Sequence, residues 1–247
     1  MSGWYFKIYD KLGEEYLKFG FVKHTKAEVD FIKKVTRIKK KAKILDLGCG
    51  FGRHSIEFAK RGYQVVGVDF SRKLLSIAKK KAKKEKVKVK FILKDAREIP
   101  FKQEFDLVIS LYDSAFGVLE NDQENFKVLQ KIHRALKSKG KFVLNIVNGA
   151  NHIKALPKTF SYKEKDRTYF GKGEFDVLTN RYYTKETMLL KNGKRIDFKT
   201  QARLYTLPEV IWLLQQAGFK VLGSYGNFEN KKLNIKDYQM TILGEKI

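Results

Sequence analysis

The stretch that decides the fold is Ile44-Leu45-Asp46-Leu47-Gly48-Cys49-Gly50-Phe51-Gly52-Arg53-His54. Residues 43–47 read as a short buried strand, and the apolar spacing of a helix begins directly after the glycines. Glycine at every second position gives the turn backbone freedom and lets a ligand approach the main chain. Such a turn directs unpaired backbone N–H groups at whatever lies above the strand. The stretch therefore predicts a cofactor-binding loop.

The spacing of the glycines narrows the choice of cofactor. The dinucleotide pattern G-x-G-x-x-G needs glycine or alanine at position 53, where Arg53 stands, so binding of a pyrophosphate is disfavoured. The pattern present, D-x-G-x-G-x-G from Asp46 to Gly52, resembles motif I of the class I S-adenosylmethionine-dependent methyltransferases. That cofactor carries an amine and a sulfonium but no phosphate, which suits an acidic residue at the strand end. The resemblance implies cofactor contacts from Asp46, Gly48, Cys49, Gly50, Gly52, Arg53 and His54.

Length and composition bound the class of protein. The chain has 247 residues, enough for one compact α/β domain with an insertion. No apolar run approaches the ~20 residues of a membrane helix, and the N-terminus lacks the apolar core of a secretory signal. We therefore expect a cytoplasmic protein. The one cysteine, Cys49, lies in the glycine loop, which argues against a disulfide framework and a cysteine zinc site, and we predict no metal.

The chain is strongly basic, with 52 Lys and Arg against 27 Asp and Glu and a formal net charge of +25. This excess is compatible with nucleic-acid binding. It is equally compatible with a thermophile proteome rich in Lys and Glu, or with a codon-biased genome. The main lysine clusters precede predicted strands or follow predicted helices, which places them at the sheet edge away from the cofactor.

Residues 4–35 are predicted to form one or two amphipathic helices rich in aromatic residues. Packing in the core is the simplest interpretation of this pattern. In many methyltransferases of this class, however, such a segment folds over the cofactor. We take Tyr16 as a candidate cofactor contact and Tyr5 as a candidate acceptor contact.

Acidic residues follow the next two predicted strands. Residues 64–68 form a buried strand that ends at Asp69 and Phe70, and an acidic residue there can accept hydrogen bonds from both ribose hydroxyls of a nucleoside cofactor. An N-cap is the alternative role for Asp69, although Ser71 is available for it. Residues 87–93 form a half-buried third strand. The resemblance implies that Asp95 and Ala96, which follow it, contact adenine; a simple turn role for Asp95 is the alternative.

A fourth strand, residues 105–111, ends at Leu111 and opens into Tyr112-Asp113-Ser114-Ala115. Ligands of open α/β sheets lie beyond the carboxyl ends of the strands, so we place Leu111 at the cofactor and Tyr112 and Asp113 at the methyl acceptor. This segment lacks the prolines typical of adenine-N6 methylation, and Cys49 is in the wrong loop for carbon-5 pyrimidine chemistry. The catalytic residue stays unassigned; Asp113, Tyr112 and His54 are the candidates if a general base is needed.

A helix is predicted from Asn121 or Asp122 to about residue 138, with strand five at 141–147. The α/β rhythm then stops. Three antiparallel strands are predicted at about 169–178, 181–191 and 194–204, the last two joined by an Asn-Gly hairpin turn. This insertion should cover the cleft and build the acceptor pocket. Arg203, where it rejoins the core, either binds an acidic acceptor or is a surface or strand-pairing arginine.

The resemblance covers nearly the whole chain and points to the small-molecule type with a methyltransferase-25-like domain. It implies a Rossmann-like α/β sandwich, in which a seven-stranded, mostly parallel sheet has one antiparallel strand near the C-terminus, with a small antiparallel β insertion. We expect a single domain over 1–247: a helical lid at about 1–40, a core at 41–147 and 206–247, and the insertion at about 148–205.

The predicted function is methyl transfer from S-adenosylmethionine to an oxygen or nitrogen atom of a small-molecule acceptor, with S-adenosylhomocysteine as the product. An RNA methyltransferase is the rival enzyme, and a basic, aromatic-bearing acceptor mouth would favour it. A cofactor-binding protein without catalysis is the rival from another class. We expect a monomer or homodimer and no membrane partner.

Overall fold

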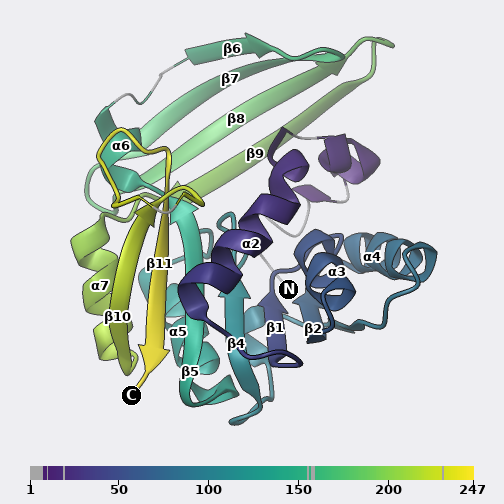
Figure 1. Cartoon of the computed structure of the whole chain (residues 1–247). Helices are drawn as coiled ribbons and strands as arrows, with labels where there is room; N and C mark the ends of the chain where they lie inside the picture. The colour runs from purple at the N-terminus through teal and green to yellow at the C-terminus, as the bar shows by residue number, and fades with distance from the viewer. Residues whose placement is uncertain (1–7, 10, 19, 155, 157–158, 230) are drawn as a thin grey trace.

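The computed structural model describes residues 8–9, 11–18, 20–154, 156, 159–229 and 231–247. Its strands form two sheets, one of seven strands in the order β10-β11-β5-β4-β1-β2-β3 and one of four in the order β6-β7-β8-β9. The strands of the larger sheet are β1 (Lys43–Leu47), β2 (Gln64–Asp69), β3 (Lys90–Leu93), β4 (Phe105–Ser110), β5 (Leu136–Val147), β10 (Phe219–Gly226) and β11 (Gln239–Lys246). Figure 1 shows the four-stranded sheet curving beyond the arrowheads of the parallel strands.

The seven-stranded sheet has the predicted topology. Strands β1 to β5 pair in parallel, and β11 lies antiparallel between β5 and β10. Sequence order reverses at β1, which has β2 on one side and β4 on the other. The loops after β1 and β4 therefore meet at one edge, at the point where α/β sheets bind ligands. The predicted fold class is confirmed.

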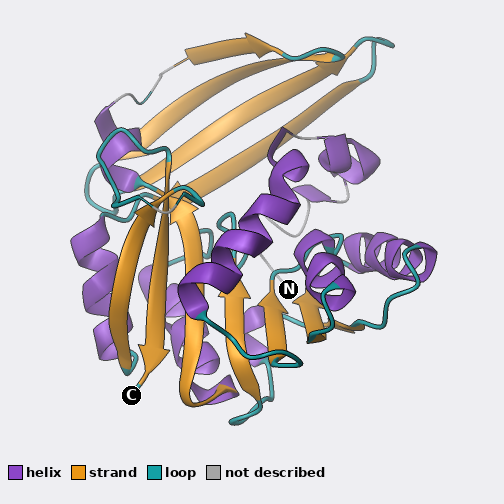
Figure 2. Cartoon of the chain, in the orientation of Figure 1, coloured by secondary structure: helices purple, strands orange, loops and turns teal. Residues whose placement is uncertain are grey.

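Helices cover both faces of this sheet (Figure 2). The helices of the chain include α2 (Thr25–Thr36), α3 (Arg53–Lys60), α4 (Arg72–Lys84), α5 (Asp122–Ala135), α6 (Gly149–Lys154) and α7 (Leu207–Gln216), with 3₁₀ turns η1 (Gly13–Lys18), η2 (Gly20–His24) and η3 (Ala96–Glu98). Of these, α6 lies beyond the strand ends, beside the four-stranded sheet (Figure 1). One core cluster joins α5 and α7 to one face through residues such as Leu129 and Leu214. A second joins α2 and α3 to the other face through Ile32 and Phe58. None of the described helices is both long enough and apolar enough to span a membrane.

The four-stranded sheet consists of β6 (Thr159–Lys163), β7 (Arg167–Asp176), β8 (Arg181–Leu190) and β9 (Arg195–Arg203), all antiparallel. Strands β7 to β9 lie where three strands were predicted, and β6 is an additional one. One face carries Tyr169, Met188 and Phe198, which pack on Ile8 and Leu12 of the N-terminal segment. We call this the cleft face; the opposite face is exposed, as at Phe170 and Tyr183.

Two predicted boundaries are wrong. Strand β5 begins at Leu136, where Leu136 pairs with Phe105, so the helix ends at Ala135 although its apolar spacing continues. Strand β3 begins at Lys90 and not at Val87, and its pairing with β2 starts at Val66.

Candidate active site

The glycine loop adopts the conformation that its sequence predicts. Gly48, Gly50 and Gly52 all have positive φ, and Gly52 is the N-cap of α3. The backbone N–H groups of Gly48 and Cys49 donate to the carbonyl oxygen of Val68 at 2.8 and 3.0 Å, which ties the loop to β2. Cys49 is buried, and burial raises the pKa of its thiol. The cysteine is therefore a packing residue of the loop and not an activated thiolate.

Asp69 lies at the end of β2 beside this loop. Its Oδ2 accepts from the Gly50 N–H at 2.7 Å, and its Oδ1 accepts from the Ser71 N–H at 2.8 Å. Ser71 is the N-cap of α4 and bonds the Leu74 N–H, so the N-cap alternative falls to Ser71. Burial raises the pKa of Asp69 to about 6. These bonds use only part of the roughly four lone-pair sites of an ionised carboxylate, which leaves acceptor capacity for ribose hydroxyls.

Asp46 supports the loop from within β1. Its Oδ2 accepts a hydrogen bond from the hydroxyl of Ser55 in α3 at 2.6 Å, and burial raises its pKa to about 6. The contact fixes the start of α3 relative to the strand. Asp46 is 3% exposed, so any cofactor group that reached it would meet a desolvated carboxylate.

A narrow pocket lies between the ends of β1, β2 and β3. It is lined by 12 residues, among them the predicted Gly48, Asp69, Phe70, Asp95 and Ala96. In the same pocket, the Asp95 carboxylate forms an ion pair with Arg97 at 2.6 Å. Its Oδ1 also accepts from the Arg97 N–H at 2.8 Å, which caps η3. These contacts favour the turn role for Asp95, whereas contact with adenine stays a prediction.

Aromatic side chains of the N-terminal segment lie over the loop. The Tyr16 ring meets Phe51 edge-on at 6.0 Å and Tyr9 at 5.0 Å, and Tyr9 lies 5.7 Å from Phe70. Burial raises the pKa of Tyr16 to about 12. Tyr9 is a neighbour that sequence reasoning missed, although its spacing of seven residues from Tyr16 was a signal. Tyr5 lies outside the described residues.

The segment after β4 is held in an unusual conformation. Tyr112 and Asp113 both have φ in the left-handed region, at 59° and 53°. Each such residue costs about 1–2 kcal/mol, so the surroundings must enforce it. Asn145 does so: its Oδ1 accepts from the Tyr112 N–H at 3.2 Å, and its carbonyl accepts from the Asp113 N–H at 3.3 Å. Leu111, just before this turn, is buried in the core beneath it.

This turn directs the Asp113 carboxylate toward β5, where both oxygens accept from the Val147 N–H at 3.1 and 3.2 Å. Burial raises the pKa of Asp113 to about 7. Among the described residues no basic side chain forms an ion pair with it. Asp113 is thus a desolvated carboxylate that can exchange a proton near neutral pH, as a general base must.

A buried network on the other side of the loop contains one residue that sequence reasoning missed. Glu28 of α2 is 1% exposed and accepts hydrogen bonds from Arg53, from Tyr112 and, at 2.7 Å, from His54 Nε2. Burial alone would raise the pKa of Glu28, but the contacts with His54 and Arg53 lower it. The Arg53 guanidinium also lies 4.7 Å from the centre of the Tyr112 ring. Arg53, His54 and Tyr112, three predicted site residues, thus converge on one carboxylate.

His54 is neutral in this network. Burial, and then the neighbouring Arg53 charge, lower its pKa to about 4. Its Nε2 therefore carries the proton that binds Glu28, and His54 holds α2 against α3. This occupation of Nε2 disfavours His54 as a general base.

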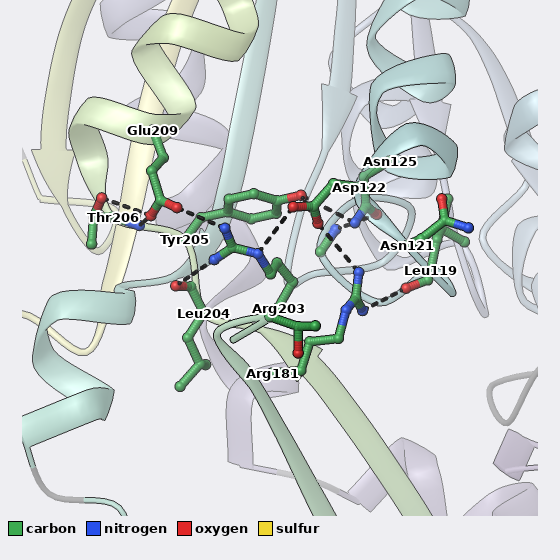
Figure 3. Close-up of polar contacts among 12 residues, drawn as sticks. Leu119, Asn121, Asp122, Asn125, Arg181, Arg203, Leu204, Tyr205, Thr206 and Glu209 are labelled. Atoms are coloured by element: carbon green, nitrogen blue, oxygen red, sulfur yellow. Dashed lines mark hydrogen bonds and ion pairs between the residues drawn. The ribbon is translucent and has the colours of Figure 1, made fainter. Parts of the chain in front are cut away.

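Arg203 lies at the junction of the two sheets (Figure 3). Its Nη2 bonds Glu209 at 2.7 Å, its Nε bonds Asp122 at 3.3 Å, and its Nη1 bonds the Leu204 carbonyl at 3.2 Å. All three guanidinium nitrogens thus bind the protein itself. The contacts favour a structural role for Arg203, and its binding of an acidic acceptor stays an untested prediction.

The loop fits a cofactor that approaches its backbone closely. A Cβ placed on Gly50 would come no nearer than 3.9 Å to another side chain, so this point of the turn faces open space. At Gly48 and Gly52, by contrast, a Cβ would meet Ser114 at 2.5 Å and Phe91 at 2.9 Å. These two glycines permit packing, and Gly50 is the one that leaves room for a ligand.

The class of protein follows from comparison with known families. Residues 38–196 match the family model described as a methyltransferase domain. The chain belongs to this family, with the Rossmann-like class I fold, and is an S-adenosylmethionine-dependent methyltransferase.

Particular relatives support the assignment. The chain is similar to the cypemycin N-terminal methyltransferase of a Streptomyces species, with 27% identity over 82% of each chain. A crystal structure of an S-adenosylmethionine-dependent methyltransferase from Clostridium acetobutylicum matches with a TM-score of 0.84 and 21% identity, over 96% of this chain and 98% of the other. The sugar N-methyltransferase KedS8 from a Streptoalloteichus species matches with a TM-score of 0.67 and 15% identity, over 94% and 92%.

Proposed function

We propose that this methyltransferase acts on an oxygen or nitrogen atom of a small-molecule acceptor. The acceptor would lie between the Tyr112-Asp113 turn and the cleft face of the four-stranded sheet, which would act as the roof of a single domain. We further propose a cytoplasmic location.

S-adenosylmethionine supplies a methyl group that is already activated by a sulfonium. Asp69 would bind the ribose hydroxyls, Gly48 to Gly52 would line its backbone-facing side, and Phe70 and Ala96 would enclose the adenine. The aromatic pair Tyr9 and Tyr16 would exclude water from above. The enzyme's main task is then to align the acceptor with the methyl group, an effect of proximity and orientation.

The observation that carries the proposal is Asp113, a half-buried carboxylate at the carboxyl end of β4 whose pKa is raised to about 7. In the transfer, the S–CH₃ bond breaks with its electron pair left on sulfur, and the acceptor lone pair forms the new bond. The proton that an oxygen or nitrogen nucleophile must lose passes to the Asp113 carboxylate. The neighbouring Asn145 contacts would hold this carboxylate in place throughout.

Two features favour a small acceptor over a long RNA. The N-terminal aromatic residues and the cleft face cover the edge where the acceptor would bind. Lys79, Lys83 and Lys88 instead lie in a depression with Lys43 and Gln64, at the start of β1 and β2, which is the opposite edge of the sheet. One relative is named as a cypemycin N-terminal methyltransferase, and one solved structure of the same fold as a sugar N-methyltransferase.

The test is incubation with methyl-labelled S-adenosylmethionine and a cell extract, followed by separation of small molecules, RNA and protein. Label in the small-molecule fraction, lost in Asp113→Asn, is expected. Label confined to RNA or to protein would overturn the proposal, as would the absence of transfer to any fraction.

A further inference from the structure

Glu186 lies on the cleft face of β8, two residues before the buried Met188. Its Oε1 accepts from the Thr184 hydroxyl at 2.6 Å and, more weakly, from Thr200 at 3.5 Å. The two threonine hydroxyls are themselves 2.6 Å apart. No described residue donates to Oε2. The carboxylate is thus held in position through one oxygen while the other keeps its capacity to accept.

Two aromatic rings lie over the glycines of β7 that pair with Glu186 and with Thr184. Gly171 pairs with Glu186, and Gly173 pairs with Thr184. A Cβ on Gly171 would lie 2.1 Å from Cζ of Phe160, and one on Gly173 would lie 1.9 Å from the Tyr182 hydroxyl. The two side chains therefore lie flat over the glycine backbone. The glycines in Phe170-Gly171-Lys172-Gly173 thus admit aromatic rings beside a carboxylate.

Basic side chains line the same pocket as Glu186 without binding it, and the Lys11 ammonium donates instead to the Asp197 carbonyl oxygen at 3.0 Å. Lys172, Lys185 and Lys199 lie on neighbouring positions of β7, β8 and β9, but alternation along a strand places them on the exposed face. Glu186 forms no ion pair with a described residue, although the chain carries a net charge of +25. Burial raises the pKa of Glu186. A partly buried carboxylate that forms no ion pair within the protein suggests that its positively charged partner is part of a ligand.

Glu186 and Asp113 are linked through the N-terminal segment and through Tyr238. The cleft face packs on Ile8 and on Tyr9, and Tyr9 reaches the Phe70 ring of the cofactor edge. The ring of Tyr238 lies 4.5 Å from that of His152. Burial raises the pKa of Tyr238, and the negative charges of Asp113 and then Glu186 raise it further. A compound bound beside Tyr238 would therefore have Asp113 toward the cofactor and Glu186 toward the roof.

We propose that the acceptor carries a protonated amine, which binds Glu186 Oε2 and lies against the rings of Phe160 and Tyr182. A carboxylate flanked by aromatic faces recognises an ammonium by a charge-assisted hydrogen bond and by cation–π attraction. The amine anchors the compound, and the atom to be methylated lies near Asp113. This inference names the acceptor class and rests on the proposed function.

The first test uses the wild-type enzyme. A small-molecule extract is passed over a cation-exchange resin at neutral pH, and the retained and unretained compounds are incubated separately with methyl-labelled S-adenosylmethionine. Label in the retained fraction is the expected result. Label only in unretained small molecules would overturn the amine inference and leave the proposed function intact, whereas label only in RNA or protein would overturn both.

The second test compares Glu186→Gln with Glu174→Gln. Glu174 is an exposed carboxylate on the opposite face of the same sheet, so it controls for loss of charge. With a dilution series of the retained fraction, Glu186→Gln should raise the half-saturating concentration at least ~10-fold, since a charged hydrogen bond is lost. Its affinity for S-adenosylhomocysteine should be unchanged, and Glu174→Gln should match wild type. Equal half-saturation in Glu186→Gln would overturn the inference.

Discussion

Two regions of this methyltransferase bury acidic side chains in opposite ways. Behind the cofactor loop, Glu28 is enclosed by Arg53, His54 and Tyr112, so its charge is matched within the protein. In the cleft, Asp69, Asp113 and Glu186 form no ion pair with any residue that the structure describes, and burial raises the pKa of all three. The first arrangement fixes one helix against another, and the second leaves carboxylates ready for a ligand.

The difference is informative because basic side chains outnumber acidic ones almost two to one. A buried carboxylate without a basic partner is costly, and the chain had many lysines with which to avoid that cost. We infer that the unmatched carboxylates are kept for groups that arrive from outside: ribose hydroxyls at Asp69, the acceptor proton at Asp113 and the acceptor amine at Glu186.

The largest effect should come from Asp113→Asn. Loss of a general base typically lowers the rate by about 10²–10⁴-fold, while S-adenosylhomocysteine binding should be kept. Since a base acts when deprotonated, wild-type kcat/KM should rise as the pH passes about 7, and the variant should lose this rise. A pH series of labelled transfer measures both. Wild-type rates in the variant would remove Asp113 from the chemistry.

A change in the Glu28 network should lower the free energy of unfolding. Glu28→Gln leaves the Arg53 charge buried with a weaker partner, and breaking a buried pair costs about 3–5 kcal/mol of unfolding free energy. Denaturant unfolding measures this loss. The control is Glu85→Gln, which breaks an exposed contact with Lys60 and should cause no measurable change. Equal stability of the two variants would show that the Glu28 network does not hold α2 in place.

A smaller effect is expected from Gly171→Ala. The new Cβ would displace the Phe160 ring, at a cost of about 1–3 kcal/mol in stability. The half-saturating acceptor concentration should rise, while cofactor affinity should stay at the wild-type value. Lys172→Ala, the next residue on the exposed face, is the control. If the half-saturating acceptor concentration of a folded Gly171→Ala protein equalled that of wild type, the cleft face would not be the roof of the site.

The smallest effect should come from changing Lys79, Lys80, Lys83 and Lys84 to Gln. These lysines lie at the C-terminal end of α4, where positive charge complements the helix dipole. Methyl transfer should be nearly unchanged and only weakly dependent on salt. An RNA acceptor along that edge would instead cause a marked loss of efficiency and a shallower salt slope in the variant.

Sequence reasoning placed the glycine loop beside Asp69 because the signals for both are local. The glycines and Asp69 follow strands directly, so alternation and spacing place them at one edge before any contact is known. The left-handed turn at Tyr112-Asp113 had no such signal, because it depends on Asn145, more than 30 residues away.

The cleft face was harder to predict because its arrangement depends on cross-strand register. The surroundings of Glu186 can be described only when Gly171 is known to pair with it. Strand β6, which carries Phe160, was not predicted at all. Glu28 was also missed, since helical spacing marks its neighbours Val29 and Ile32 as core but does not show that Arg53 lies above it.

The measurement that tests the central claim most directly is calorimetric titration of wild type and Asp69→Ala with S-adenosylhomocysteine. Asp69 sits at the glycine loop with acceptor capacity left over, so its removal should weaken binding by about 1–3 kcal/mol. Thermal unfolding of the variant shows whether it is folded. Unchanged affinity in a folded Asp69→Ala protein would contradict the assignment of the cofactor site at this loop.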